Sequence, residues 1–341
     1  MPAHCCSLSV TCGAAGHKSF GLNNIVMEDE QIHKPVLRKE VLEYLVQPHA
    51  ERIVDGTLGA GGHAGAILEA CPGARMLGIE RDPEMLTIAR ENLSDSADRV
   101  EFVQGKYSDM ARLCEEYGWQ RVDGVLLDLG VCSYHLDSAE RGFAHRYDGP
   151  LDMRFDRRSE GTAAELLNHA SEDELRRILA EYGEERKAKK LAKAIVQRRE
   201  KRPWMRTGEL KELVASVVGR GQGGGLPPAT RTFQALRIAV NDELRELEKG
   251  LTAAVNILKE KGRLVVISFH SLEDRRVKRF FREEAASCVC PPEIPECRCG
   301  KTARLSVLTK KPVRCRPEEK EDNPRAGSAR LRAAEKLPDE R

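Results

Sequence analysis

The sequence predicts an α/β fold with a mostly parallel, Rossmann-like sheet, helices on both of its faces, and an all-helical insertion. Three observations support this prediction. Short apolar runs alternate with helical patterns between positions 37 and 128, a glycine-rich turn follows the first of these runs, and residues 137–225 carry helical patterns without a strand. Such alternation is typical of parallel strands that are joined by crossover helices.

Residues 27–136 are predicted to form the first part of the sheet domain. Pro83 suits the first turn of a helix capped by Asp82, and the apolar run 122–128 is typical of a buried parallel strand. The expected strands are 52–55, 75–80, 100–104 and 122–128, and the expected helices are 37–45, one that ends near 68, 83–93 and one that ends at 117. Residues that follow parallel strands should share one cleft.

Residues 137–225 form the predicted insertion, which suits substrate recognition because loops and insertions beside a rigid sheet often carry function. Its expected helices are 163–167, 172–182, 187–199 and 207–218. The second part of the sheet domain then spans 226–341. It should contain a long helix at 233–258, a strand at 262–269, a basic helix at 272–284 and two closing strands at 305–309 and 329–333.

Residues 1–26 lack the pattern of a signal or transit peptide, and we expect a disordered leader that lies upstream of a natural start at Met27. No apolar run has the length of a membrane span. Cys71, Cys114 and Cys132 stand singly, as reduced packing residues do. These features predict a cytoplasmic protein without a membrane partner, and they carry no signal for an oligomeric state.

The stretch DGTLGAGGH at 55–63 predicts a cofactor cradle. Its glycines let the backbone take positive φ and approach a ligand, while N–H groups at the following helix start point outward. Glu80 ends the next strand, where a carboxylate binds the ribose hydroxyls of a nucleotide. The short, glycine-dense loop and Asp55 favour S-adenosylmethionine (SAM), although residues 59–64 also satisfy the relaxed dinucleotide pattern.

Asp128, after the fourth strand, is the candidate catalytic residue. Methyl transfer from a sulfonium is an in-line displacement that depends mainly on alignment. An exocyclic amine acceptor also needs a group that accepts its hydrogen bond and helps its proton leave. A carboxylate that binds the cofactor's adenine or caps a loop is the alternative role, and both roles place Asp128 in the pocket.

Seven motifs together resemble the bacterial small-subunit ribosomal RNA cytosine-N4 methyltransferases, the RsmH/MraW family. The resemblance covers residues 33–337, and the set in this order is highly specific. The motifs are DGTLGAGGH at 55–63, LDLGV at 127–131, ERGF at 140–143, DGPLDMR at 148–154, YGEER at 182–186, ATRTFQA at 229–235 and ISFHSLED at 267–274.

The resemblance implies SAM-dependent N4-methylation of a decoding-centre cytidine in 16S rRNA, on the small ribosomal subunit. It implies that the cofactor is bound by Gly61, Gly62, His63, Glu80, Tyr107, Asp128 and His135. Glu80 and Tyr107 stand where Asp and Phe are also used, and His135 stands where the family pattern has Gln. A neutral imidazole still donates one hydrogen bond and accepts another.

The RNA would contact residues outside the cofactor cradle. Two basic blocks, Arg186 to Arg206 with ten Lys or Arg and Arg298 to Arg316 with seven, suggest a polyanionic partner. The helices 187–202 and 275–282 are expected to bind phosphates. Phe143 and Trp204 are candidates to stack on an unpaired base, with core packing as the alternative. Residues expected near the target cytosine are Asp152, Arg154, Asn241 and His270.

Four cysteines at 288, 290, 297 and 299 form two C-x-C pairs around a proline-rich spacer. Cys288, Cys290, Cys297 and Cys299 are candidate ligands of a tetrahedral structural zinc in a loop too short to have its own core. Free or redox-active thiols are the alternative, because C-x-x-C is the commoner spacing.

Two other functions remain open from the residues. A nucleotide-dependent oxidoreductase would match the relaxed pattern at 59–64 but leaves the basic insertion unexplained. A ribosome-associated RNA-binding factor without turnover would match the basic blocks, but the intact cradle and Asp128 weigh against it.

Overall fold

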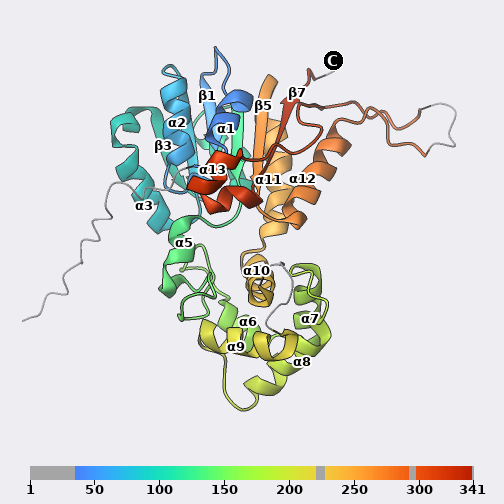
Figure 1. The fold of residues 1–341 in the computed structure, drawn as a ribbon. Helices are drawn as coiled ribbons and strands as arrows, with labels where there is room; N and C mark the ends of the chain where they lie inside the picture. The colour runs from blue at the N-terminus through green and yellow to red at the C-terminus, as the bar shows by residue number, and fades with distance from the viewer. Residues whose placement is uncertain (1–34, 220–226, 292–296, 340–341) are drawn as a thin grey trace, which may run out of the picture. The chain divides into compact units, whose positions relative to one another are not determined.

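The computed structural model describes residues 35–219, 227–291 and 297–339 (Figure 1). The predicted leader, residues 1–26, and the predicted start at Met27 lie outside these residues. The strands are β1 Arg52–Asp55, β2 Arg75–Glu80, β3 Val100–Gln104, β4 Val122–Asp128, β5 Leu258–Ser268, β6 Leu305–Val307 and β7 Arg330–Lys336. They form one sheet in the order β3-β2-β1-β4-β5-β7-β6.

The predicted fold class is confirmed. The five neighbouring strands β3, β2, β1, β4 and β5 pair in parallel. Strand β7 runs antiparallel to β5, and β6 runs antiparallel to β7. The order 3-2-1-4-5 brings the carboxyl ends of β1 and β4 together at the point where strand order reverses. The predicted closing strands are therefore an antiparallel pair at one edge of the sheet.

Two layers of helices cover the sheet. On one face, α1 Arg38–Leu45, α2 Gly62–Ala70 and α3 Pro83–Asn92 bury Val41, Ile67 and Leu86 against the sheet. On the other, α4 Met110–Glu116, α11 Glu243–Ile257 and α12 Ser271–Glu284 bury Leu113, Leu251 and Phe281. The remaining short elements are α5 Ser133–Asp137, α13 Pro317–Asp322 and the 3-10 turns η2 Ser94–Arg99, η3 Tyr107–Asp109, η4 Ala139–Arg141 and η5 Pro324–Ser328.

The insertion has a hydrophobic core of its own. It consists of α6 Ala163–His169, α7 Glu172–Glu181, α8 Ala188–Arg199 and α9 Thr207–Val218, and α10 Pro228–Asn241 packs against them (Figure 1). Leu175, Leu191 and Leu236 are fully buried in this core. The helix at 207–218 has the predicted bounds.

One predicted helix is wrong. The helix expected at 233–258 is two helices, α10 and α11, which are separated at Asp242 with φ 52°. Asp tolerates this left-handed conformation better than most residues, so the helical pattern continues in the sequence through a break in the backbone. The strand after α11 also begins at Leu258, four residues before the expected position.

Within the described residues, no helix is both long and apolar enough to cross a membrane.

Candidate active site

A cavity of about 1080 Å³ opens over the carboxyl ends of β1, β2, β4 and β5. Of the seven residues predicted to bind the cofactor, all but Gly61 line it: Gly62, His63, Glu80, Tyr107, Asp128 and His135. Pockets for small ligands usually measure about 300–1,000 Å³, so this cavity is large enough for a nucleoside cofactor.

The glycines of the cradle have different tasks. Gly59 has φ +54°, and a Cβ there would meet only the Thr57 carbonyl at 3.9 Å, so this position opens into the cavity. Gly61 has φ +86°, but a Cβ there would lie 2.9 Å from Leu93. Gly61 therefore permits the close packing of α2 on α3. Gly59, a predicted cradle glycine that is not among the seven predicted cofactor residues, leaves the space for a ligand.

Glu80 is held in place by the cradle itself. Its carboxylate oxygens accept hydrogen bonds from the backbone N–H groups of Gly59 and Asp82, each at 2.8 Å. Burial raises the pKa of Glu80, and these hydrogen bonds oppose that shift. Each oxygen keeps a lone pair for a further donor, so the fixed carboxylate fits the ribose hydroxyls of a nucleoside.

Tyr107 packs beneath α11. A Cβ at Gly250 would lie 2.3 Å from its ring, so the absence of a side chain at Gly250 makes room for this aromatic wall. Desolvation raises the pKa of the Tyr107 hydroxyl well above its ordinary value, and the nearby Glu243 adds to the shift. The ring is therefore a neutral, flat surface suited to an adenine.

Asp128 lies in an acidic corner with Asp55 and His63. Its Oδ2 is 3.6 Å from His63 Nε2, while its buried Oδ1 has no hydrogen-bond partner among the described residues. Burial raises the pKa of Asp128 well above its ordinary value, and the carboxyls of Asp55 and Glu273 add to this shift. Burial also raises the pKa of Asp55 to about 7, although the Thr57 N–H lowers it. No Lys or Arg of the described residues forms an ion pair with Asp55 or Asp128.

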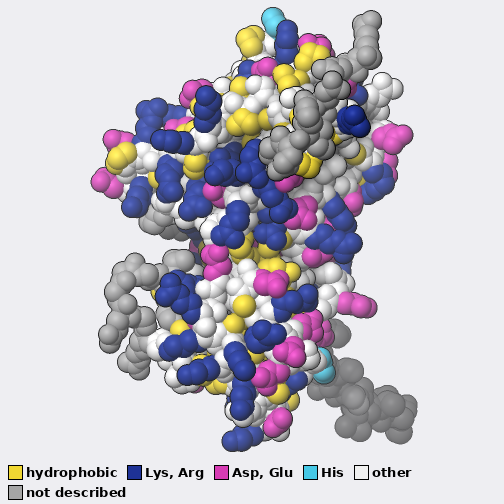
Figure 2. All heavy atoms as spheres, turned by 90° about the vertical axis from the view of Figure 1, so that its right-hand side faces the viewer, with side chains coloured by type: hydrophobic (Ala, Val, Ile, Leu, Met, Phe, Trp, Pro, Cys, Tyr) yellow, Lys and Arg dark blue, Asp and Glu magenta, His cyan; other side chains and the backbone are white. Residues whose placement is uncertain are grey.

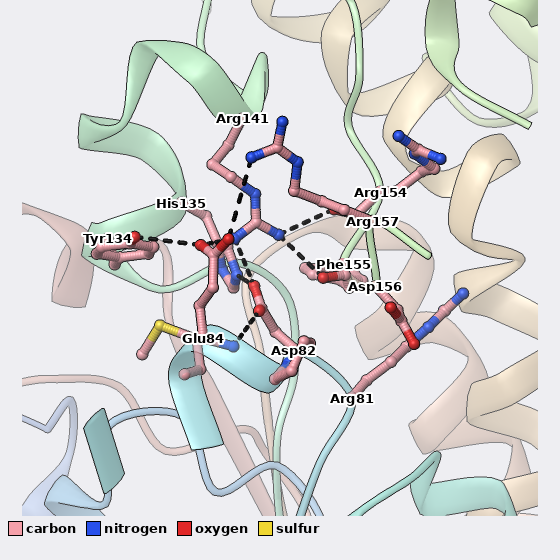
Figure 3. A network of polar contacts seen from close by, with 12 residues as sticks. Arg81, Asp82, Glu84, Tyr134, His135, Arg141, Arg154, Phe155, Asp156 and Arg157 are labelled. Atoms are coloured by element: carbon pink, nitrogen blue, oxygen red, sulfur yellow. Dashed lines mark hydrogen bonds and ion pairs between the residues drawn. The ribbon is translucent and has the colours of Figure 1, made fainter. Parts of the chain in front are cut away.

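His135 is bound to protein groups on both ring nitrogens (Figure 3). Nε2 lies 2.8 Å from Asp82 Oδ2, and Nδ1 lies 3.2 Å from Cys132 Sγ. Burial alone lowers the pKa of His135, but the contacts with Cys132 and Asp82 outweigh it and raise the pKa to about 9. The ring lines the cavity and contacts Phe143 and Phe155.

Arg141 joins the insertion to the sheet domain. Its guanidinium is buried, and Nη1 lies 2.6 Å from Asp82 Oδ2 and 3.0 Å from Glu84. Nη2 donates to the carbonyls of Arg154 and Phe155 (Figure 3). Because a buried guanidinium with a broken ion pair is strongly destabilising, this residue fixes where the chain enters the insertion.

The four residues expected near the target base are not brought together. His270 lines the cavity, with Nε2 3.0 Å from Glu273. Asn241 also lines it, but its amide bonds the backbone of Met153 and Phe155. Asp152 and Arg154 form a bidentate pair with each other and do not line the cavity. Their role in the structure is to shape the loop before α6.

The two aromatic candidates also differ. Phe143 lines the cavity and stacks on Phe155 at 5.3 Å between ring centroids. The base-stacking role of Trp204 is wrong, because its ring is fully buried in the insertion core and its Nε1 donates to the Ile195 carbonyl. Trp204 packs in the core of the insertion, which was the alternative role predicted for it.

The outer wall of the cavity is basic. The arginines that line it there are Arg146, Arg186, Arg231, Arg314, Arg325 and Arg330. Lys and Arg side chains also gather on the face that carries α12 (Figure 2). In α8, by contrast, Arg199 donates to carbonyls of α6 and Arg198 lies over Trp204, so part of this basic block supports the insertion core.

The four clustered cysteines converge in the structure. The Sγ atoms of Cys288, Cys290, Cys297 and Cys299 all lie within 4.8 Å of one another. Hydrogen bonds from the backbone, first of all from Val289 N–H, lower the pKa of Cys299 to about 6. Of the spacer between the two C-x-C pairs, 291–296, residues 292–296 lie outside the described residues.

Some site residues had no signal in the sequence. Asp82 was expected only as a helix cap, and it does accept the Glu84 N–H, but it also binds His135 and Arg141. Glu273 accepts the N–H groups of Phe269 and His270 and so shapes the turn after β5. The cap pattern at Asp82 could have marked one such residue, but its other two partners lie 53 and 59 positions away in the chain.

Known proteins similar to this chain are methyltransferases. A model of the MraW methylase family matches residues 30–337. The chain is 52% identical over 307 residues to ribosomal RNA small subunit methyltransferase H of Geobacter sulfurreducens, with 89% of this chain and 99% of that protein covered. It is 50% identical over 311 residues to the protein of the same name from Heliobacterium modesticaldum, with 89% and 98% covered.

Similar solved structures are far more distant in sequence. An rRNA methylase from Streptococcus thermophilus has 8% identity and a TM-score of 0.39, with 88% of this chain and 94% of that chain covered. A precorrin-6y C5,15-methyltransferase from Geobacter metallireducens has 11% identity and a TM-score of 0.38, with 88% and 87% covered.

Proposed function

The chain belongs to the MraW methylase family, and from this membership we propose that it transfers a methyl group from SAM to N4 of a decoding-centre cytidine in 16S rRNA. The substrate would be the small ribosomal subunit, and the reaction would take place in the cytoplasm. One observation supports this most: a single cavity contains the glycine cradle, Glu80 and Asp128 at one end and an arginine-rich wall at the other.

The residues at the cradle end fit SAM, which supplies an electrophilic methyl group on a cationic sulfur. Glu80 would hold the ribose, Tyr107 would form the adenine wall, and Gly59 leaves the backbone open to the ligand. The acidic corner of Asp55 and Asp128 suits a positive charge, since buried carboxyls without a cation nearby are costly to ionise.

Asp128 is proposed as the group that accepts a hydrogen bond from the target amine. Its side chain lines the cavity with 21% of its surface exposed, and its buried Oδ1 has no partner among the described side chains and backbone groups. The N4 lone pair of cytosine is delocalised into the ring, and an acceptor that takes up the proton as the new bond forms lowers the barrier. His270 and Phe143, on the same cavity wall, would then position the base.

An assay with labelled SAM and undermethylated small subunits tests this function. We expect label in 16S rRNA and N4-methylcytidine by nucleoside mass spectrometry. Asp128→Asn, which keeps the shape of the side chain, should lower turnover by about 10²–10⁴-fold, the usual contribution of a proton-transfer group. SAM binding without label in the RNA would contradict the substrate, and full activity of the variant would contradict the role of Asp128.

We also propose that Cys288, Cys290, Cys297 and Cys299 bind one zinc ion. Two of the Sγ···Sγ distances are 3.5 and 3.8 Å, close to the ~3.8 Å edge of a tetrahedron with Zn–S bonds of about 2.3 Å. The thiols share their protons unequally, since the pKa of Cys299 is lowered to about 6 and that of Cys288 is raised to about 12, so the distances between the sulfur atoms carry the argument for zinc. The ion would order a segment with few buried contacts of its own.

Metal analysis of protein purified without chelator should find one zinc per chain. Cys299→Ser should lose it, whereas the control Cys315→Ser, which changes a thiol outside the cluster, should retain it. If no zinc is present and all four thiols titrate freely, the zinc site is refuted.

A further inference from the structure

Cys132 is a cavity-lining thiol that the proposed methyl transfer does not use. The residue is half-buried and lies between the end of β4 and the start of α5. Its Sγ is 3.2 Å from His135 Nδ1 and 3.6 Å from the sulfur of Met85. It therefore has a nitrogen base within hydrogen-bond distance on one side and the open cavity nearby.

A carboxylate stands behind the imidazole. His135 Nε2 lies 2.8 Å from Asp82 Oδ2, and both side chains are buried. Asp82 is in turn held by the Glu84 N–H and by Arg141. A thiol, an imidazole and a carboxylate in this sequence of contacts form the arrangement that activates nucleophilic cysteines, because the carboxylate orients the ring and stabilises its charged form.

The other charged groups near the thiol act in the same direction. Arg325, from η5, donates to the neighbouring Ser133 hydroxyl at 2.5 Å, and its guanidinium and the Cys132 sulfur interact electrostatically. Glu84, the nearest further carboxylate in the network, is bound to Arg141 and Tyr134. Arg325 therefore places a positive charge near the sulfur, as is found around cysteines that react as nucleophiles.

We propose that Cys132 is a nucleophilic thiol that reacts with hydroperoxides at the wall of the cofactor cavity. The Sγ proton moves to Nδ1 of the neutral His135 ring, which becomes positively charged, and a sulfur lone pair attacks the nearer peroxide oxygen. The S–O bond forms as the O–O bond breaks, and hydroxide leaves and takes up a proton as water. Sulfur is oxidised by two electrons to a sulfenic acid, and the peroxide is reduced.

The product would alter the cavity rather than the surface. Cys132 lines the same space as Gly59, Glu80 and Asp128, so an added oxygen reduces the room for the cofactor. We expect SAM affinity to fall on oxidation and to recover with a thiol reductant. A loss of RNA methylation would follow only through the proposed function, whereas thiol reactivity and SAM binding can be measured without it.

Alkylation by iodoacetamide, followed by peptide mass spectrometry of the whole chain, tests the reactivity. Cys315 is an internal comparator, since it is also half-buried but burial raises the pKa of its thiol. At pH 6.5 an ordinary thiol with pKa near 8.5 is only about 1% ionised, so Cys132 should react at least about tenfold faster than Cys315. Equal rates would overturn the proposal.

Two variants separate activation from mere exposure. His135→Gln should lower the alkylation rate at Cys132 to that at Cys315, because the ring that accepts the Sγ proton is lost. His145→Gln, which changes a histidine on the same cavity that bonds Thr230, should leave the rate at Cys132 unchanged. An unchanged rate in His135→Gln would overturn the proposal, and the comparison of Cys132 with Cys315 in the wild type tests it even if the variants do not fold.

Hydrogen peroxide then tests the reaction itself. A sulfenic-acid trap should label Cys132, and SAM affinity measured by calorimetry should fall at least about fivefold, which is ~1 kcal/mol, and return with dithiothreitol. In Cys132→Ser, compared with its own untreated sample, peroxide should leave SAM affinity unchanged. The absence of trapped sulfenic acid, or an equal loss of affinity in Cys132→Ser, would overturn the proposal.

Discussion

The two ends of the active-site cavity carry opposite charge. At the cradle end, Asp55, Glu80 and Asp128 lie close together, and burial raises the pKa of each. At the outer end, the arginines come from the insertion, from α10 and from the C-terminal segment, and Arg186 and Arg314 are exposed. A site divided in this way suits a cationic cofactor in the depth and a polyanion at the entrance, because each end repels the wrong ligand.

The two ends are also built differently. The cradle is made mostly of backbone within one βαβ unit, held by Glu80 and by the glycines. The outer end is made of long side chains from segments far apart in the sequence, and many of them have weak surface ion pairs or none that the structure describes. A single substitution at the cradle end should therefore cause a large loss of SAM affinity. A single substitution at the outer end should weaken binding of the small subunit only in part.

Gly59→Asn should have the largest effect. Asn tolerates the left-handed φ of this position, and its side chain would point into the open cradle. We expect SAM affinity to fall by at least about 100-fold, or ~2.7 kcal/mol, with little change in stability. Calorimetric titration with SAM and a thermal melt are the measurements.

Gly118→Asn is the matched control. Gly118 has φ +71°, a Cβ there would meet no heavy atom within 4 Å, and the residue lies outside the cavity lining. The SAM affinity of this variant should equal that of the wild type. Similar losses in both variants would mean that the effect at Gly59 arises from the backbone and not from occupation of the cradle.

Arg186→Gln should have a smaller effect, at the other end. This exposed side chain lines the cavity and has no ion pair among the described residues. We expect binding of the small subunit to weaken about three- to tenfold, and the slope of log affinity against log salt to fall by about 0.7–0.9, as for one lost phosphate contact. SAM affinity should not change.

Arg177→Gln, an exposed arginine of α7 outside this cavity, is its control. It should change neither the affinity nor the salt slope. If Arg186→Gln weakened SAM rather than the subunit, the division of the cavity into two ends would be refuted.

The smallest expected effect is a pH dependence of SAM binding. Because the pKa of Asp55 is raised to about 7, this carboxyl is mostly protonated at pH 6 and mostly charged at pH 8. A cation binds better to the charged form, so SAM affinity should rise about three- to tenfold over this range. S-adenosylhomocysteine, which lacks the sulfonium charge, should show a flatter profile.

The same group has the opposite effect on the free protein. A carboxyl whose pKa is higher in the folded than in the unfolded chain stabilises the fold below its unfolded value of 3.8, and this contribution is lost as pH rises through about 7. Without ligand, this contribution to the melting temperature should therefore decrease as pH rises through about 7. With saturating SAM, the decrease should be absent. Equal pH profiles for SAM and S-adenosylhomocysteine would exclude the acidic corner as the cation site.

Much of the fold follows from local patterns in the sequence. The strand at 122–128 and the helix at 207–218 have their predicted bounds, because an apolar run and a 3.6-residue period depend only on neighbours in the chain. The cradle was predictable for the same reason, since glycines clustered after a strand allow few other backbone paths.

Side-chain directions were not predictable in this way. Gly61 and Gly59 look equivalent in the sequence, and only the packing of α3 makes one a contact with Leu93 and the other a wall of the cavity. Trp204 could have faced RNA or the core, and the insertion helices that surround it decide for the core. The break at Asp242 is likewise invisible in a continuous helical period.

The sequence by itself determined the order of strands and helices and the position of the glycine cradle. It also determined the positions of Asp55 and Glu80 at the ends of β1 and β2, because these features depend on short-range backbone preferences. Only the tertiary structure decided that His135 lies between Cys132 and Asp82, and that Arg141 binds the start of α3 to the loop of the insertion. The contacts of Asp82 with His135 and with Arg141 join segments whose distance in space depends on how whole layers pack, and a local pattern carries no record of that packing.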